Sequence, residues 1–252
     1  MARKHLIFAA VGDKSLHGMW APHADRTYDL WLIYYGDDEA RAEQYRGECD
    51  QFWQEKGQKL HLMEHLRDRG YFSYEGYDFV WFPDDDIAIT PDQIERFFEI
   101  MAEEQLDIAQ PGLIGYANHP ITRVHRPFKL RWTNFVEVMA PAFSAEALMR
   151  CAPSFKENVS SYGLDHLWWH VLRCPERGLG IVDEVPMLHT RAFQSKDRYD
   201  YAYGEALAVF EKYKISRQIY VLGGKVRGVA VGRTVARVLN RLFNGQAKPC
   251  SF

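Results

Sequence analysis

The sequence predicts an α/β domain whose mostly parallel central sheet is covered by helices on both faces. Short apolar runs alternate along the chain with longer charged stretches of helical periodicity, the order that parallel strands joined by helices produce. Polar clusters follow directly on several of these runs, and ligands bind beyond the carboxyl ends of strands in such sheets. The 252 residues suffice for one such domain over residues 1–215 and a basic tail over residues 216–252.

Two apolar runs open the chain, His5–Val11 and Tyr28–Tyr35, and each is closed by a glycine and an aspartate. Their length and these turn residues predict buried strands. The pattern from Glu39 to Arg69 is charged and helical, so one or two helices separate the second strand from the third. The third strand is predicted at Tyr77–Phe82, which runs into a proline and three aspartates.

Capping signals start the next helix. Thr90 is a good capping residue and Pro91 suits the first turn. An apolar stripe follows at helical spacing, formed by Ile94, Phe97, Phe98 and Met101. A short strand is predicted after this helix, at Asp107–Gln110.

The second half of the chain continues the alternation. The pattern predicts a strand, two helices, a last strand and a third helix, at Asn134–Pro141, Ala145–Cys151, the loop-to-helix segment Ser160–Leu172, Gly180–His189 and Tyr201–Tyr213. Ser144 is expected to cap the first of these helices. Pro186 indicates that the last strand lies at an edge of the sheet, because proline cannot donate to a ladder.

Composition and motifs exclude several classes of protein. The net charge of −3 argues against a protein that coats nucleic acid. The four cysteines form no CxxC pair and no zinc-ligand spacing, which favours reduced thiols and a cytoplasmic location. The first apolar run is too short for a secretory signal, and no stretch of about 18 apolar residues predicts a membrane span. A GxGxxG fingerprint after the first strand, a Walker GxxxxGK(S/T) motif and a GxSxG elbow are all absent from the sequence.

The strongest chemical signal is the run of three aspartates after the third strand, Asp84, Asp85 and Asp86, with apolar residues on both sides. Carboxylates this close repel one another unless a cation lies among them. Hard divalent ions such as Mg²⁺ and Mn²⁺ bind carboxylate and phosphate oxygens. Alternation along an extended chain would point Asp84 and Asp86 to the same side, so that a DxD pair shares one ligand. The alternative is a solvated acidic turn.

Three other residues carry candidate chemistry. His189 ends the last predicted strand and is either a surface or core histidine or a second metal ligand beside Asp86. Asp165 stands where a loop becomes a helix, so it either caps that helix or takes the proton of an acceptor hydroxyl as general base. Glu137 lies between apolar neighbours and is either paired structurally or holds an acceptor hydroxyl.

Two positions near the N-terminus are candidates for nucleotide binding. Asp13 belongs to the loop after the first strand, where a nucleotide would be cradled. Lys59 opens a helix, where a lysine either meets a phosphate or ribose or remains solvated.

Taken together, the segments YDFVWFPDDDI, DIAQPGL, RVHRPF, NFVEVMAPAFS, YGLDHLW and GIVDEVPMLH resemble the domain-of-unknown-function family 707. That family is regarded as glycosyltransferase-like, and some members are labelled lysine-ketoglutarate reductase trans-splicing related. The matching blocks run in the expected order from Tyr77 to His189. The reductase label implies nothing here, because no dinucleotide fingerprint accompanies it.

The resemblance implies a GT-A fold, that of the nucleotide-diphospho-sugar transferases, and assigns roles to the residues above. It implies that Asp84 contacts the ribose or orders the loop and that Asp86 binds the metal. Asp165 would occupy the position of the catalytic base and His189 that of the second metal ligand. The expected donor-binding residues are Asp84, Asp85, Asp13 and Lys59, and the expected acceptor-binding residue is Glu137.

We therefore expect a metal-dependent glycosyltransferase that uses Mn²⁺ or Mg²⁺ and moves a sugar from a nucleotide-diphosphate sugar, with a UDP-sugar favoured. The acceptor would be a hydroxyl of a glycan or of a lipid-linked molecule. Direct displacement would invert the anomeric carbon, and the alternative is a retaining transfer. Two alternatives remain. One is a metal-dependent nucleotidyltransferase or phosphohydrolase with the same acidic cluster, and the other is a non-catalytic binding module of the same fold.

The basic tail predicts one amphipathic helix at Thr234–Phe243, because Gly228 and Gly232 weaken any earlier start. Its apolar positions share one face and its arginines another, namely Val235, Val238, Leu239 and Leu242 against Arg233, Arg237 and Arg241. Such a helix either lies peripherally on an anionic membrane or packs on the catalytic domain with its arginines in water.

Overall fold

The computed structural model describes the chain apart from residues 1–3, 22–25, 74–75, 193–195, 227 and 245–252. Its strands are β1 (His5–Val11), β2 (Tyr28–Tyr34), β3 (Gln51–Gln54), β4 (Phe79–Trp81), β5 (Ile87–Ala88), β6 (Ile108–Gly115), β7 (Phe128–Thr133), β8 (Ala142–Ser144), β9 (Leu179–His189), β10 (Val221–Val226) and β11 (Val229–Val231). Its α-helices are α1 (Glu39–Arg46), α2 (Lys59–Asp68), α3 (Pro91–Glu103), α4 (Ala145–Cys151), α5 (Leu164–Val171), α6 (Lys196–Tyr213) and α7 (Arg233–Asn244).

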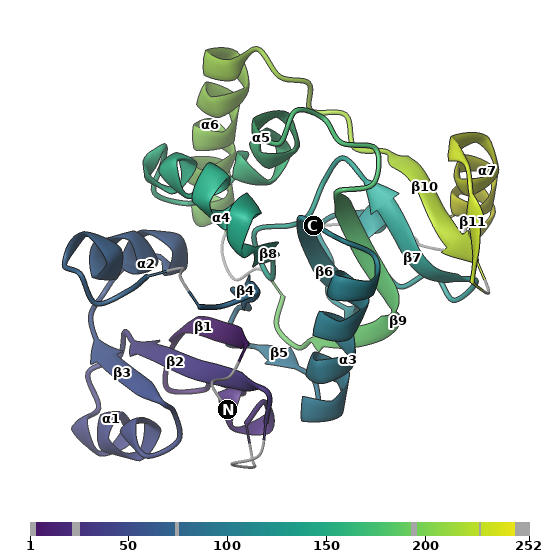
Figure 1. Ribbon diagram of the computed structural model, residues 1–252. Coiled ribbons are helices and arrows are strands. Elements are labelled where there is room, and N and C mark those ends of the chain that lie inside the picture. The colour runs from purple at the N-terminus through teal and green to yellow at the C-terminus, as the bar shows by residue number, and fades with distance from the viewer. Residues whose placement is uncertain (1–3, 22–25, 74–75, 193–195, 227, 245–252) are drawn as a thin grey trace.

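The strands form one sheet in the order β11-β10-β7-β9-β6-β8-β4-β1-β2-β3, and β5 pairs with β9 outside this order (Figure 1). β3, β2, β1 and β4 are parallel neighbours, as are β6 and β9. β8 is antiparallel to β4 and β6, and β7 is antiparallel to β9 and β10. The predicted parallel pairing is therefore confirmed for β3, β2, β1 and β4 and for β6 with β9, whereas β8, β7 and β10 add antiparallel pairs that were not predicted. Because β8 is antiparallel to both of its neighbours, β4 and β6 run in the same direction. β6 and β9 therefore end at the same edge of the sheet as β1, β2 and β4.

Helices cover both faces of the sheet, and β1 shows how each face is filled. Ile7 and Ala9 pack in one apolar cluster with residues of α1 and α3, whereas Leu6 and Phe8 pack in another with residues of α2, α4 and α5. Successive side chains of a strand point to opposite faces, so β1 is buried on both. This is the doubly covered α/β sheet that the sequence predicts.

Several predicted elements are confirmed closely. β1 has the predicted bounds, and α3 begins with a capping box in which Thr90 accepts from the Gln93 backbone and the Gln93 side chain accepts from the Thr90 N–H. Ser144 caps α4 through a hydrogen bond from the Ala147 N–H at 3.2 Å. α5 (Leu164–Val171) lies within the predicted loop-to-helix segment Ser160–Leu172.

Two predicted features are wrong, and several strands were not predicted. Residues 134–141 form a buried loop and turn, not a strand, because their polar groups bond to side chains and distant loops: the Glu137 N–H donates to Gln110 Oε1 at 2.6 Å. Pro186 lies in β9 inside the sheet, where β7 pairs only with Gly180 and Ile181 and leaves the proline unopposed on that side. The strands that the sequence analysis did not predict are β3, β5, β7, β8, β10 and β11.

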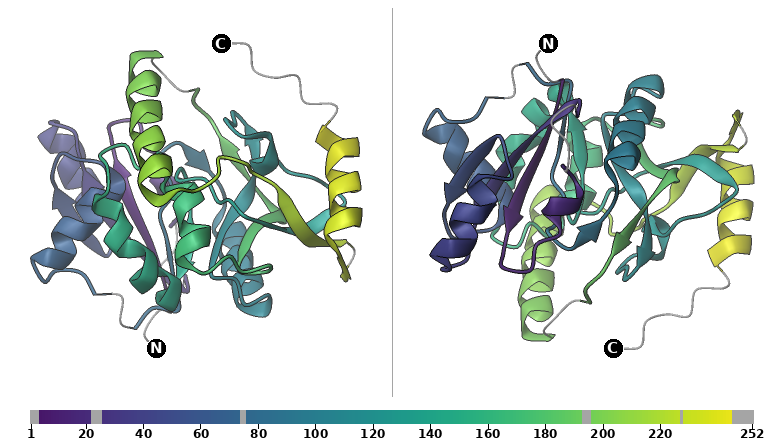
Figure 2. Two further views of the ribbon diagram at one scale, coloured as in Figure 1. Left: turned by 90° about the horizontal axis from the view of Figure 1, so that it is seen from above. Right: turned by 90° about the horizontal axis from the view of Figure 1, so that it is seen from below.

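The chain after α6 adds to the sheet. The predicted boundary at residue 215 falls between α6 and β10, and β10 then pairs with β7. α7 confirms the predicted terminal helix and packs against β10, at the opposite end of the molecule from α1 and α2 (Figure 2). The Arg233 and Arg237 guanidiniums lie 5.4 and 5.9 Å from the ring centre of Tyr220. No helix within the described residues is long and apolar enough to cross a membrane.

Candidate active site

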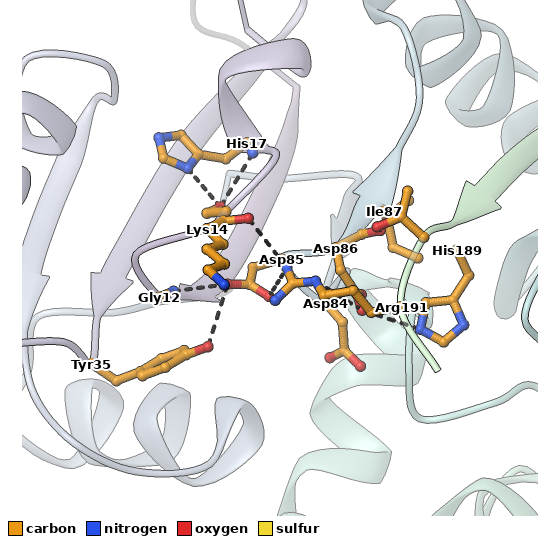
Figure 3. Close-up of polar contacts among 12 residues, drawn as sticks. Gly12, Lys14, His17, Tyr35, Asp84, Asp85, Asp86, Ile87, His189 and Arg191 are labelled. Atoms are coloured by element: carbon orange, nitrogen blue, oxygen red, sulfur yellow. Dashed lines mark hydrogen bonds and ion pairs between the residues drawn. The ribbon is translucent and has the colours of Figure 1, made fainter. Parts of the chain in front are cut away.

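The three aspartates lie in a turn between β4 and β5, at the carboxyl edge of the sheet (Figure 3). The Asp84 N–H donates to Met139 O at 2.9 Å, and the Ile87 N–H donates to Asp84 O at 3.3 Å. The extended alternation expected for this segment is therefore wrong. A turn sends the three carboxylates to three different sets of partners.

Asp85 connects this turn to the loop after β1. Its Oδ2 accepts from the Gly12 N–H at 2.8 Å and from the Tyr35 hydroxyl at 3.3 Å. Its carbonyl oxygen accepts from the Leu16 N–H at 2.7 Å. The side chain is buried, with both oxygens bonded, since Oδ1 accepts from Arg191 at 3.0 Å. These contacts fix the acidic turn against the expected nucleotide loop.

Asp86 lies beside His189, as expected. His189 Nε2 is 3.3 Å from Asp86 Oδ2, and His189 Nδ1 bonds to Tyr116 O at 2.8 Å. Burial opposes the charged imidazole, but the hydrogen bond and charge of Asp86 raise the pKa of His189 above its usual value. The pairing of Ile87 in β5 with His189 in β9 sets this distance.

The residues Asp86 and His189 fit a divalent cation. Asp86 Oδ1 is buried and has no hydrogen-bond partner among the described residues, and because Nδ1–H is donated to Tyr116 O, the Nε2 atom beside Asp86 can ligate a cation once it gives up its proton. In the part of the chain that the structure describes, no group of three or more His, Cys, Asp or Glu side chains is placed to hold a metal ion. Two protein ligands, with phosphate and water oxygens completing the shell, are typical of Mg²⁺ in phosphate-binding sites.

Asp84 is held by Lys59, the first residue of α2. The Lys59 ammonium donates to Asp84 Oδ1 at 2.7 Å, to Val138 O at 3.0 Å and to Met139 O at 2.9 Å. These three partners use the three donors of an ammonium group. Lys59 thus joins the acidic turn to the 134–141 loop, which is a different contact from the phosphate or ribose contact predicted for it.

Asp165 and Glu137 form a second acidic pair near this loop. Asp165 lies in the first turn of α5 and accepts from the backbone N–H groups of His166, Val138 and Gly163. Burial first, and then the charge of Glu137, raise the pKa of Asp165 to about 8. The N-cap of α5 is Gly163, so Asp165 is not the capping residue.

The Glu137 carboxylate faces the connection between β6 and β7. Its Oε1 accepts from Asn118 Nδ2 at 3.3 Å, and its Oε2 lies 3.3 Å from Thr122 Oγ1. Glu137 is 3% exposed. Lys59 donates to Val138 O, and Asp165 accepts from the Val138 N–H. Val138 thus connects the acidic pair to Lys59, the residue that holds Asp84.

Asp13 lies at the end of β1, in the loop where it was expected. Its Oδ1 accepts from the Tyr34 hydroxyl, which in turn accepts from the Asp38 N–H. Asp13 therefore ties the loop after β1 to the loop after β2.

Arg191 and Tyr35 are site residues that sequence reasoning missed. Arg191 follows β9 in a loop and Tyr35 follows β2, and neither position carries a local pattern. The available signal for Tyr35 was its place at a predicted strand end beside Gly36. For Arg191 it was its position two residues after His189.

Comparison with known proteins places the chain among known folds. A family model described as "Protein of unknown function (DUF707)" matches residues 73–221. No curated protein matches the sequence. S. aureus TarS 1-349 superimposes with a TM-score of 0.53 at 13% identity, over 83% of this chain and 72% of that one. TarS 1-349 in complex with UDP-GlcNAc gives 0.54 at 11% identity, over 83% and 66%. The predicted glycosyltransferase-like α/β fold is thereby confirmed.

Proposed function

Since this chain belongs to the DUF707 family, whose model spans more than half of it, we propose from its fold and site that it is a metal-dependent glycosyltransferase. The donor would be a nucleotide-diphosphate sugar and the acceptor a hydroxyl of a glycan or a lipid-linked molecule. The observation that carries this proposal is Asp86 beside His189 at the carboxyl edge of the sheet. The likeness to a fold solved with UDP-GlcNAc supports a UDP-sugar as donor.

In this proposal the diphosphate lies between the acidic turn and the loop after β1. Asp86 and His189 would hold the cation, which, when bound, supplies positive charge to the departing nucleoside diphosphate. Asp85 keeps the Gly12 loop in place, and Lys59 keeps Asp84 in place. We assign Lys59 this positioning role in preference to a direct contact with the donor.

The chemical step would be a direct displacement. The acceptor oxygen forms a bond to the anomeric carbon while the bond from that carbon to the phosphate oxygen breaks, and the nucleoside diphosphate leaves with the electron pair. Asp165 would take the acceptor proton, since a base works best with a pKa near the working pH and that of Asp165 is raised to about 8. Attack on the face opposite the leaving group inverts the anomeric configuration. Glu137 would orient the acceptor hydroxyl.

A donor panel tests the activity directly. With Mn²⁺ present, we expect one nucleotide sugar to be consumed only when a sugar acceptor is added. Consumption without acceptor would indicate a phosphohydrolase, and release of pyrophosphate would indicate a nucleotidyltransferase. Binding of nucleotide without turnover of any donor would leave a binding module.

We also expect UDP binding to depend on a divalent cation, because the acidic turn and a diphosphate repel each other. Calorimetric titration of UDP with Mn²⁺, and again with excess chelator, measures this dependence. Equal affinities in the two titrations would remove the metal from the proposal.

We also propose that α7 contacts an anionic membrane, where a lipid-linked acceptor would be found. Val235 and Val238 are 49% and 52% exposed, and Arg233, Arg237 and Arg241 are also exposed. The side chains of Leu239 and Leu242, the other residues of the predicted apolar face, lie outside the described residues. We expect salt-sensitive cosedimentation with vesicles that contain anionic lipid. Truncation after Gly224 should abolish it, and equal binding by the truncated chain would exclude this helix as the contact.

A further inference from the structure

Arg191 lies against the acidic turn, between Asp85 and His189 (Figure 3). Its Nη2 donates to Asp85 Oδ1 at 3.0 Å and to Lys14 O at 3.3 Å, and its Nε lies 3.5 Å from Asp86 Oδ2. One guanidinium thus touches two of the three aspartates and the loop after β1. The side chain is 30% exposed, so one part of it remains open to a ligand.

The neighbouring residue holds the backbone of Arg191 in this position. The Thr190 N–H and hydroxyl both donate to Asp86 O, at 3.2 and 2.9 Å. His189 and Arg191 share Asp86 Oδ2, at 3.3 and 3.5 Å. The segment that leaves β9 is therefore fastened to the acidic turn by backbone as well as side chains, and Arg191 needs no large movement to reach a ligand bound there.

The charges of the turn are balanced by protein groups. Lys59 bonds Asp84, and Arg191 bonds Asp85 and approaches Asp86. A free acidic turn would repel the diphosphate of a donor, and this pairing reduces that repulsion. A divalent cation bound to Asp86 would lie near the Arg191 guanidinium, and the two positive charges would repel each other.

We propose that Arg191 is a diphosphate-binding residue of the donor site, which holds Asp85 and Asp86 in the free protein and contacts the phosphate oxygens when the nucleotide binds. This inference rests on the proposed function for its ligand. A guanidinium is planar, remains charged and matches phosphate oxygens through paired N–H groups. The described residues engage its Nη2 and Nε atoms, which leaves Nη1 for the ligand.

Two consequences distinguish this role from support of the turn alone. Loss of Arg191 removes hydrogen bonds to the diphosphate, so affinity for the ligand falls. The same loss removes a positive charge from beside Asp86, so affinity for a divalent cation without nucleotide stays equal or rises. A residue that only supported the turn would lower both affinities together.

The experiment titrates Arg191→Ala with three probes: Mn²⁺ alone, UDP with Mn²⁺, and inorganic pyrophosphate with Mn²⁺. We expect the affinities for UDP and pyrophosphate to fall by about 10- to 100-fold, the usual effect of charge-assisted hydrogen bonds. We expect Mn²⁺ alone to bind at least as tightly as to the wild type. Arg191→Lys keeps the charge and loses the paired geometry, so its affinities should lie between the two.

The matched control is Arg69→Ala, because the Arg69 side chain is 54% exposed and its described contacts are to Glu55 and the Tyr71 ring, not to a residue of the proposed donor site. It should leave all three affinities unchanged. Unchanged UDP affinity in Arg191→Ala, or a parallel fall for Mn²⁺ alone, would overturn the assignment. If wild-type protein binds neither UDP nor pyrophosphate, the assignment and the proposed function fail together. If Arg191→Ala behaves as expected but no donor is turned over, only the proposed function fails.

Discussion

Replacing Asp165 with asparagine is expected to lower sugar-transfer turnover by about 10²–10⁴-fold, the usual contribution of a general base. Wild-type turnover should rise with pH and level off above about 8, because the base acts only when deprotonated and the pKa of Asp165 is raised to about 8. The variant should lose this pH dependence. UDP affinity should change little, since Asp165 bonds the backbone of the 134–141 loop and not the acidic turn.

The same substitution should stabilise the protein in alkaline solution. A carboxyl whose pKa is 3.8 when unfolded and about 8 when folded binds its proton more tightly in the folded state. The stability that this proton provides is complete below about pH 4 and is lost as the pH rises through about 8. Asparagine cannot ionise and keeps its contribution at every pH. The melting temperature of the variant should therefore rise relative to that of the wild type from pH 4 to pH 9, by about 2–4 °C for each kcal/mol of unfolding free energy that the wild type loses.

Thermal scans at several pH values, together with single-turnover assays, measure both effects. Asp107→Asn is the matched control, because burial also raises the pKa of Asp107. Asp107 directly precedes β6, at the end of that strand opposite the carboxyl edge, and its N–H donates to Gly178 O. Asp107→Asn should leave turnover unchanged. More than about a tenth of wild-type turnover in Asp165→Asn would place the base elsewhere.

Asp86→Ala is expected to abolish the Mn²⁺-dependent part of UDP binding. Loss of a partner that only orients a ligand lowers metal affinity by about 10–100-fold, so loss of the ligand itself should cost at least about 100-fold. His189→Ala should also weaken Mn²⁺ binding, with little change in the melting temperature of the metal-free protein. Titration of Mn²⁺ and then of UDP into each variant measures these effects.

Asp68→Ala controls for the loss of one surface carboxylate, since Asp68 is half exposed and pairs with Lys156. Asp68 is the last residue of α2, whereas Lys59 is the first. Asp68→Ala should bind Mn²⁺ and UDP as the wild type does. Unchanged Mn²⁺ affinity in Asp86→Ala would show that Asp86 is not a ligand. A large fall in melting temperature with unchanged metal affinity in His189→Ala would make that histidine structural.

The elements with local signals could be predicted from the sequence, and those that depend on distant partners could not. Thr90, Pro91 and the stripe that follows are sufficient to define α3, because capping and periodicity act within a few residues. β3 is only four residues long, with polar ends, and its pairing with β2 gives no periodic signal. The 134–141 segment is apolar and buried like a strand, but its bonds to Gln110 and Tyr220 come from far along the chain.

The site divides in the same way. The acidic run marks itself in the sequence, and the resemblance points to His189, whose contact with Asp86 the structure places at 3.3 Å. The orientation of each aspartate could not be predicted, because it depends on a turn whose partners lie in the loops after β1 and β9. Arg191 was missed for the same reason, since an arginine in a loop is ordinarily solvated and only its place two residues after His189 marks it.

The pairing of β5 with β9 has a consequence for the thermodynamics of ligand binding. It joins segments that lie 102 positions apart, as measured between the directly paired residues Ile87 and His189. The carboxylate and the imidazole are therefore already ordered before any ligand arrives, and binding loses little conformational entropy at these two groups. Association at this part of the site should accordingly be limited by diffusion and desolvation, and not by a slow rearrangement of the backbone.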